Sequence, residues 1–133
     1  MKDNLFREIF HEGVHIATHV KPEESEPGLS FVTTDDKFLQ LGIWNYEKGH
    51  NLPAHFHNEF ERSSFKTNEF VFVMKGSIEC NLYTEDGSFI ESVIVGANEG
   101  ILMHEMSHEY KIIEDSIILE SKNGLYKTAI FSV

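Results

Sequence analysis

The sequence is poor in cysteine and proline. Its 133 residues include three prolines and one cysteine, Cys80, so an internal disulfide is excluded. Cys80 stands between Ile78 and Leu82, a setting typical of a small apolar side chain in a core. The composition therefore favours a reducing compartment.

Positive charge is also scarce. Eleven Lys and Arg stand against twenty-two Asp and Glu, which gives a formal net charge of -11. Such a charge repels nucleic acids and anionic membranes, so we expect neither as a partner. The first eight residues are too charged for a signal peptide, and no apolar run has the length needed to cross a bilayer. We expect a soluble, cytoplasmic protein.

Helical periodicity is nearly absent. Apolar residues occur in short runs rich in Val, Ile and Phe and closed by Gly, Asn or Asp, which is typical of β-strands. The predicted strands are residues 14–20, 29–34, 38–46, 54–58, 69–74, 77–84, 88–95, 101–104, 108–112, 116–121 and 125–131. With 41% hydrophobic residues, the chain is expected to form one domain over residues 1–133 that buries about two thirds of its unfolded surface. We predict an all-β fold, either a sandwich or a small barrel.

Three connections contain residues that favour tight turns: Lys75-Gly76, Glu85-Asp86-Gly87 and Lys122-Asn123-Gly124. Consecutive strands are therefore expected to pair antiparallel. Residues 21–28 are acidic and contain two prolines, which indicates an exposed loop. Residues 1–12 are predicted to form a short N-terminal arm, in which residues 4–11 make one or two helical turns.

Two histidines two residues apart, His55 and His57, are the first candidates for chemistry. Alternate residues of a strand share a face, so both imidazoles would point to one side and could bind one metal ion. Glu69 begins the next apolar run on the face of Val71 and Val73. A carboxylate buried there needs a cation or several hydrogen bonds as compensation. These side chains predict a metal site, and the histidine pair alone leaves open a solvated hairpin with polar ends.

The spacing of these residues resembles the first motif of the cupin superfamily. It reads Gly49, five residues, His55-Phe56-His57, eleven residues, Glu69, six residues and Gly76. The loop before the glutamate is longer than in the usual motif, which costs little because loop closure depends only logarithmically on length. The resemblance implies a jelly-roll β-barrel (a double-stranded β-helix) that holds one divalent transition metal ion.

The second cupin motif is matched only in part. Gly96 and a histidine are kept, whereas the usual proline and second glycine are missing. The resemblance makes His108 the fourth metal ligand, beside His55, His57 and Glu69, because residues 109–112 continue as a strand. His104 is the alternative fourth ligand. If His108 is the ligand, His104 either supports the ligands without binding the metal or lies on the surface.

A narrower resemblance points to small single-domain cupins associated with sugar and surface-polysaccharide pathways. It is carried by residues from His15 through Trp44, the histidine pair, Arg62, residues 67–69 and residues 120–126. It implies a small, carbohydrate-like or anionic substrate. The outward-facing Phe70, Phe72 and Met74, together with the resemblance, predict a homodimer.

The ligand set suits Fe, Mn, Ni, Co or Zn, and the residues do not choose among them. The favoured function is isomerase or epimerase chemistry, in which the metal polarises a carbonyl while a nearby base moves a proton. Glu69 and His57 are the predicted catalytic residues. Arg62, Trp44 and Tyr110 are predicted to contact the substrate, Arg62 through paired hydrogen bonds to an anionic or hydroxylated group.

Other functions stay open at this point. They are a non-haem iron dioxygenase, a non-catalytic module that binds a metal or a small molecule, and metal-free acid and base chemistry by His57 with Tyr110. Nucleophilic catalysis is not expected, because no nucleophile-elbow motif accompanies Ser63, Ser64 or Ser107.

Overall fold

The computed structural model of the protein describes residues 2–125. In that range the helical elements are α1 (Lys2–Leu5) and the 3-10 turn η1 (Pro22–Glu24). The strands are β1 (Phe6–His11), β2 (Val14–Val20), β3 (Gly28–Phe31), β4 (Gly42–Asn45), β5 (Glu69–Lys75), β6 (Ile78–Tyr83), β7 (Phe89–Val95), β8 (Gly100–Met103), β9 (Ser107–Ile112) and β10 (Ile117–Lys122). The prediction of an all-β fold is confirmed.

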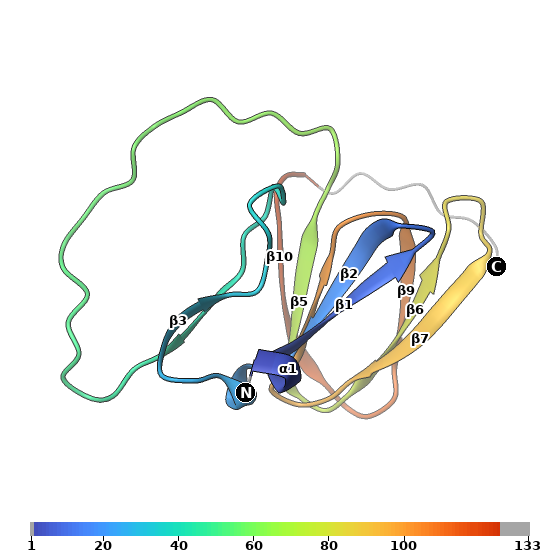
Figure 1. The fold of residues 1–133 in the computed structure, drawn as a ribbon. Coiled ribbons are helices and arrows are strands. Elements are labelled where there is room, and N and C mark those ends of the chain that lie inside the picture. The colour runs from blue at the N-terminus through green and yellow to red at the C-terminus, as the bar shows by residue number, and fades with distance from the viewer. Residues whose placement is uncertain (1, 126–133) are drawn as a thin grey trace.

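The strands form three antiparallel sheets (Figure 1). The largest has the order β1-β2-β8-β5-β10, the second has the order β7-β6-β9, and β3 pairs with β4 alone. Alternate residues of each strand point to one face, so the two larger sheets can bury one face each against the other. This gives a jelly-roll-like sandwich of two packed sheets.

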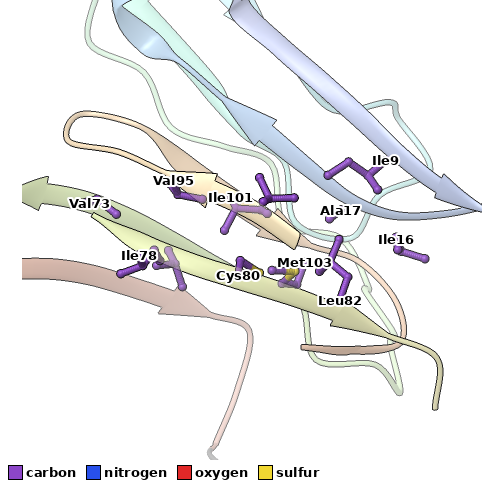
Figure 2. Packing of buried hydrophobic residues seen from close by; sticks show 12 residues of the cluster. Ile9, Ile16, Ala17, Val73, Ile78, Cys80, Leu82, Val95, Ile101 and Met103 are labelled. Atoms are coloured by element: carbon purple, nitrogen blue, oxygen red, sulfur yellow. The ribbon is translucent and has the colours of Figure 1, made fainter. Parts of the chain in front are cut away.

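The core lies between the two larger sheets (Figure 2). Val71, Val73 and Ile101 come from the five-stranded sheet, and Ile78 and Cys80 come from the three-stranded sheet. All five are at most 5% exposed. The prediction that Cys80 is a core side chain is confirmed, and β5 lies inside its sheet, between β8 and β10.

A second, smaller core lies on the outer face of the five-stranded sheet. Val32 and Ile43, from the β3–β4 hairpin, pack there with Leu5 and Val20, and Phe70 packs against this cluster. Phe70 is therefore partly covered by its own chain. Its predicted role at a subunit interface is weakened for that reason.

The connection at Lys75-Gly76 is tight, but the strands that it joins do not pair. β5 and β6 belong to different sheets, so the expectation that consecutive strands pair is wrong here. Gly76 has φ +90°, and an added Cβ would lie within 3 Å of the backbone of Asp115 and Ser116. Only glycine combines this φ with so close an approach. The chain can therefore cross from one sheet to the other in a single sharp turn.

Several predicted elements differ from the structure. Residues 4–11 are mostly strand β1 and not helical turns, because they pair with β2 from Phe6 to His11. Residues 54–58 form no strand, since no described strand lies beside them to share backbone hydrogen bonds. The expected strands 29–34 and 38–46 shorten to β3 and β4. Most of the expected strand 125–131 lies outside the described residues.

Candidate functional site

Glu69 lies at one end of the sandwich and is hydrogen-bonded by two side chains of the opposite sheet. The Tyr110 hydroxyl donates to Glu69 Oε2 at 2.7 Å, and His108 Nε2 lies 3.1 Å from the same oxygen. A carboxylate oxygen accepts, so His108 donates through Nε2. We call these three residues the Glu69 cluster.

Strand register explains why the three side chains meet. In β9, His108 pairs with Leu82 and Tyr110 pairs with Cys80, so both point with these residues toward the core. Glu69 is the first residue of β5 in the facing sheet, on the face of the buried Val71. The cluster therefore bridges the two sheets where β5 and β9 begin. The Glu69 side chain is 14% exposed and that of His108 is 30% exposed, so solvent reaches the histidine more easily.

The electrostatics of the cluster keep Glu69 ionised and Tyr110 protonated. Burial alone would raise the pKa of Glu69, but hydrogen bonds with His108, Glu120 and Tyr110 lower it to about 2. Burial and the Glu69 charge raise the pKa of the Tyr110 hydroxyl far above its usual value. Burial, with a further contribution from Glu69, also raises the pKa of the Cys80 thiol to about 12. The cluster holds one fixed negative charge between two proton donors.

The predicted metal ligands separate into two pairs. Glu69 and His108 are in the cluster, whereas His55 and His57 lie in the long segment between β4 and β5, where every residue from 51 to 67 is exposed. Figure 1 shows this segment as a wide loop that extends away from the sheets. The two histidine rings stay together, with centroids 5.1 Å apart, and His55 Nδ1 donates to the Pro53 carbonyl.

A metal ion does not fit the four side chains as they are placed. Within residues 2–125, no group of three or more His, Cys, Asp or Glu side chains is arranged to hold one. The ligand that closes such a site, His108 Nε2, is turned to Glu69 as a hydrogen-bond donor. The first function proposed for these side chains therefore uses no metal ion.

The predicted substrate residues are also divided. Tyr110 belongs to the Glu69 cluster, whereas Arg62 stacks on Phe60 in the exposed segment, 3.8 Å from the ring centroid. Trp44 is 65% exposed on β4 and lies edge-on to Tyr46. In the described part of the chain, no hydrogen bond or ring contact joins Arg62 or Trp44 to the cluster.

A second polar group, which the sequence analysis missed, lies on the other face of the same sheet. Thr18 Oγ1 is 2.9 Å from His15 Nε2 and 3.0 Å from His104 Nε2, and all three residues are buried. His15 Nε2 also reaches the Ala17 carbonyl, which can only accept, so this nitrogen carries a proton. The Thr18 hydroxyl then donates to His104 Nε2, and the His104 proton lies on Nδ1, which has no partner among the described residues.

This group is held uncharged by its surroundings. Burial, then the nearby His15 and Lys37, lower the pKa of His104 to about 4. Burial and Lys37 likewise lower the pKa of His15. The sequence signal for this group is that His15 and Thr18 are polar residues in a strand with four apolar ones, whereas their partner His104 is 86 residues from Thr18.

An open hollow of about 800 Å³ lies at the end of the sandwich where β5 and β9 begin. Lys66 precedes Glu69, and Glu105 and Met106 precede β9, so this hollow and the Glu69 cluster share one end of the fold. The lining residues are His11, Glu12, Val14, Lys66, Thr84, Glu85, Asp86, Ser88, Glu105 and Met106. Its volume is in the range of small-molecule sites.

Comparison with known protein families, with curated proteins and with solved structures finds no match to this chain. Within the described residues, no helix has both the length and the apolar character needed to span a membrane. The function is therefore inferred from the geometry of the site.

Proposed function

We propose that the protein is a small isomerase or epimerase that moves a proton on a carbohydrate-like molecule at the Glu69 cluster. The observation that carries the proposal is a half-buried carboxylate hydrogen-bonded by a tyrosine and a histidine, at the same end of the sandwich as an open hollow. Perturbed titratable groups that meet in or beside a hollow are typical of catalytic sites.

Each member of the cluster has a distinct role in this proposal. Ionised Glu69 fixes the orientation of the other two side chains. His108, the most exposed of the three, takes a proton from the carbon next to a substrate carbonyl as a general base, through Nδ1 because Nε2 donates to Glu69. Tyr110, held protonated, turns its single O–H from Glu69 to the carbonyl oxygen and stabilises the negative charge of the enediolate that forms. Return of the proton to the neighbouring carbon, with the hydroxyl proton passing from one oxygen to the other, isomerises the sugar. Delivery of a proton from water to the opposite face of the same carbon, while His108 keeps the first proton, epimerises it.

Deuterium exchange tests this proposal without knowledge of the product. A panel of reducing sugars is incubated with the protein in D2O, and NMR follows the loss of the proton next to the carbonyl. We expect exchange on at least one sugar, reduced roughly 100-fold or more in His108→Gln and Tyr110→Phe. Tyr83→Phe is the matched control, because the Tyr83 hydroxyl donates to Glu109 of the three-stranded sheet. No exchange with any sugar, or equal rates in the two tyrosine variants, would contradict the proposal.

A metal-dependent form of this function is the second candidate. Its support is that two of the predicted ligands, Glu69 and His108, already lie 3.1 Å apart. The ion, one of Fe, Mn, Ni, Co or Zn, would need His55 and His57 to move from the exposed segment to this pair. The same site would also serve an iron dioxygenase or a non-catalytic binding module.

Elemental analysis separates the two candidates. The protein is purified without a metal-affinity tag and compared with His55→Ala and Glu69→Ala. Near-stoichiometric metal in the parent, lost in both variants, supports the metal-dependent form. Metal-free protein that retains deuterium exchange supports the first candidate.

We also propose that the protein acts as a homodimer. Met74 is 50% exposed and Leu119 is 59% exposed, and Leu119 pairs with Phe72 on the outer face of the five-stranded sheet. An exposed apolar face of this kind is usually covered by a partner. Light scattering at micromolar concentration is expected to give twice the monomer mass, and Leu119→Lys is expected to give a monomer. A monomeric parent protein would reject the dimer.

A further inference from the structure

Most buried polar side chains of the described residues gather behind Glu69. The six buried polar residues are His15, Thr18, Thr33, Asn68, Asn81 and His104. Four of them, His15, Thr18, His104 and Asn68, are joined in one hydrogen-bonded network on the outer face of the five-stranded sheet. Burying polar groups is unfavourable unless they are hydrogen-bonded, and the bonds of such a network hold its parts in one arrangement.

Asn68 connects this network to the Glu69 cluster. It directly precedes Glu69, and successive residues of a strand point to opposite faces, so Asn68 points outward where Glu69 points inward. Its side-chain Nδ2 donates to the His104 carbonyl at 3.0 Å, and its backbone N–H donates to Asn123 Oδ1 at 2.9 Å. Asn123 Nδ2 in turn donates to the Lys66 carbonyl.

These bonds tie the start of β5 to both of its neighbours in the sheet. His104 directly follows β8, and Asn123 directly follows β10, and β5 lies between these two strands. The chain before Asn68 is the exposed segment 51–67, which has few contacts that could hold Glu69. Asn68 is therefore the last residue before Glu69 that is held by hydrogen bonds to the neighbouring segments.

We propose that Asn68 is a positioning residue, which holds Glu69 within hydrogen-bonding distance of His108 and Tyr110. The inference rests on the function proposed above, because it assigns a purpose to a network that supports the Glu69 cluster. The tolerance is small, since a shift of about 1 Å would break bonds of 2.7 and 3.1 Å. Glu69 is itself the first residue of β5 in register with Met103 and Lys122, so removing the Asn68 amide is expected to loosen this terminal pairing by such an amount.

The test compares Asn68→Ala with Asn81→Ala. Both asparagines are 5% exposed, but Asn81 bonds to Glu79 and Glu109 on the outer face of the three-stranded sheet. Both variants are expected to lower the melting temperature. NMR at fixed pH then follows the His108 ring N–H and the Tyr110 hydroxyl proton, whose exchange with solvent is slowed by their bonds to Glu69.

We expect this exchange to be about tenfold faster in Asn68→Ala and unchanged in Asn81→Ala, because a typical hydrogen bond slows opening by about that factor. Asn123→Ala removes the acceptor of the Asn68 N–H and the donor to the Lys66 carbonyl but leaves the Asn68 side chain intact, so it should fold and give a smaller effect of the same sign. Unchanged exchange in Asn68→Ala, equal acceleration in Asn81→Ala, or absence of both slowed signals from the parent protein would overturn the inference.

The readout does not depend on activity, so the two proposals fail separately. Absence of deuterium exchange from every sugar counts against the proposed function alone. If the parent is active, Asn68→Ala is expected to lower kcat about tenfold with KM nearly unchanged, since it alters alignment and not binding.

Discussion

Acid is expected to destabilise the protein through His104. The ring is 4% exposed, with Nε2 accepting from Thr18, and its pKa is about 4 in the folded protein compared with 6.5 as its ordinary value. Because the folded pKa is the lower one, the unfolded chain binds the proton more readily. The contribution of the neutral ring to stability is therefore complete above about pH 6.5 and is lost as the pH falls toward 4.

The magnitude follows from the size of this shift. One pKa unit corresponds to about 1.4 kcal/mol, so the interval from 6.5 to about 4 amounts to about 3 kcal/mol. This is a large part of the 5–15 kcal/mol by which domains of this size are usually stable. His15, whose pKa is also lowered, adds to the loss in the same direction.

Urea denaturation at pH 7.5, 5.5 and 4.5 measures the effect. The parent is expected to lose about 2.5 kcal/mol or more over this range, and His104→Gln, which cannot bind the proton, should lose about 2.5 kcal/mol less. His50→Gln is the control, because His50 is exposed and stacks on Tyr46. Equal losses in the parent and in His104→Gln would refute the assignment of a buried neutral ring.

Two further predictions concern the backbone and the thiol. Gly76→Ala should lower the free energy of unfolding by about 2 kcal/mol or more, whereas Gly49→Ala, which also has positive φ but open space around it, should cost about 1 kcal/mol. Similar melting temperatures for the two variants would argue against the close approach at Gly76. Cys80, buried and with its pKa raised to about 12, should react with a thiol reagent at pH 8 only in urea. Rapid labelling of the native protein would contradict its place in the core.

Strand content was predictable because apolar residues occur in short runs rich in Val, Ile and Phe that are closed by turn residues. The predicted strand 14–20 agrees with β2 at both ends, and Glu85-Asp86-Gly87 forms the β6–β7 hairpin as expected. Which strands lie side by side was not predictable from this pattern. β5 pairs with β8 and β10, whose partner residues are about thirty to fifty positions away in the sequence, and alternation is the same for any partner.

The candidate site was predictable in part, because the sequence places a carboxylate on an apolar face of a strand. Glu69 on an apolar face required compensation, and the structure supplies it through His108 and Tyr110, two residues singled out from the sequence. The bond between Asn68 and His104 joins residues 36 positions apart, and nothing in the local sequence of either residue indicates the other. For the histidine pair the sequence predicted structure that does not form. The alternate positions of the two histidines predict a strand, but no described strand includes them.

Ligand mapping by NMR is the most direct test of whether the substrate binds at the Glu69 cluster. The sugar that shows deuterium exchange is titrated into the labelled protein, and the side-chain signals of all histidine, tyrosine and tryptophan rings are followed. We expect the His108 and Tyr110 signals to shift first and with the same Kd, while those of Trp44 and Tyr46 stay in place. Shifts confined to Trp44 and Tyr46, with His108 and Tyr110 unchanged at saturation, would show that the Glu69 cluster is not where the substrate binds.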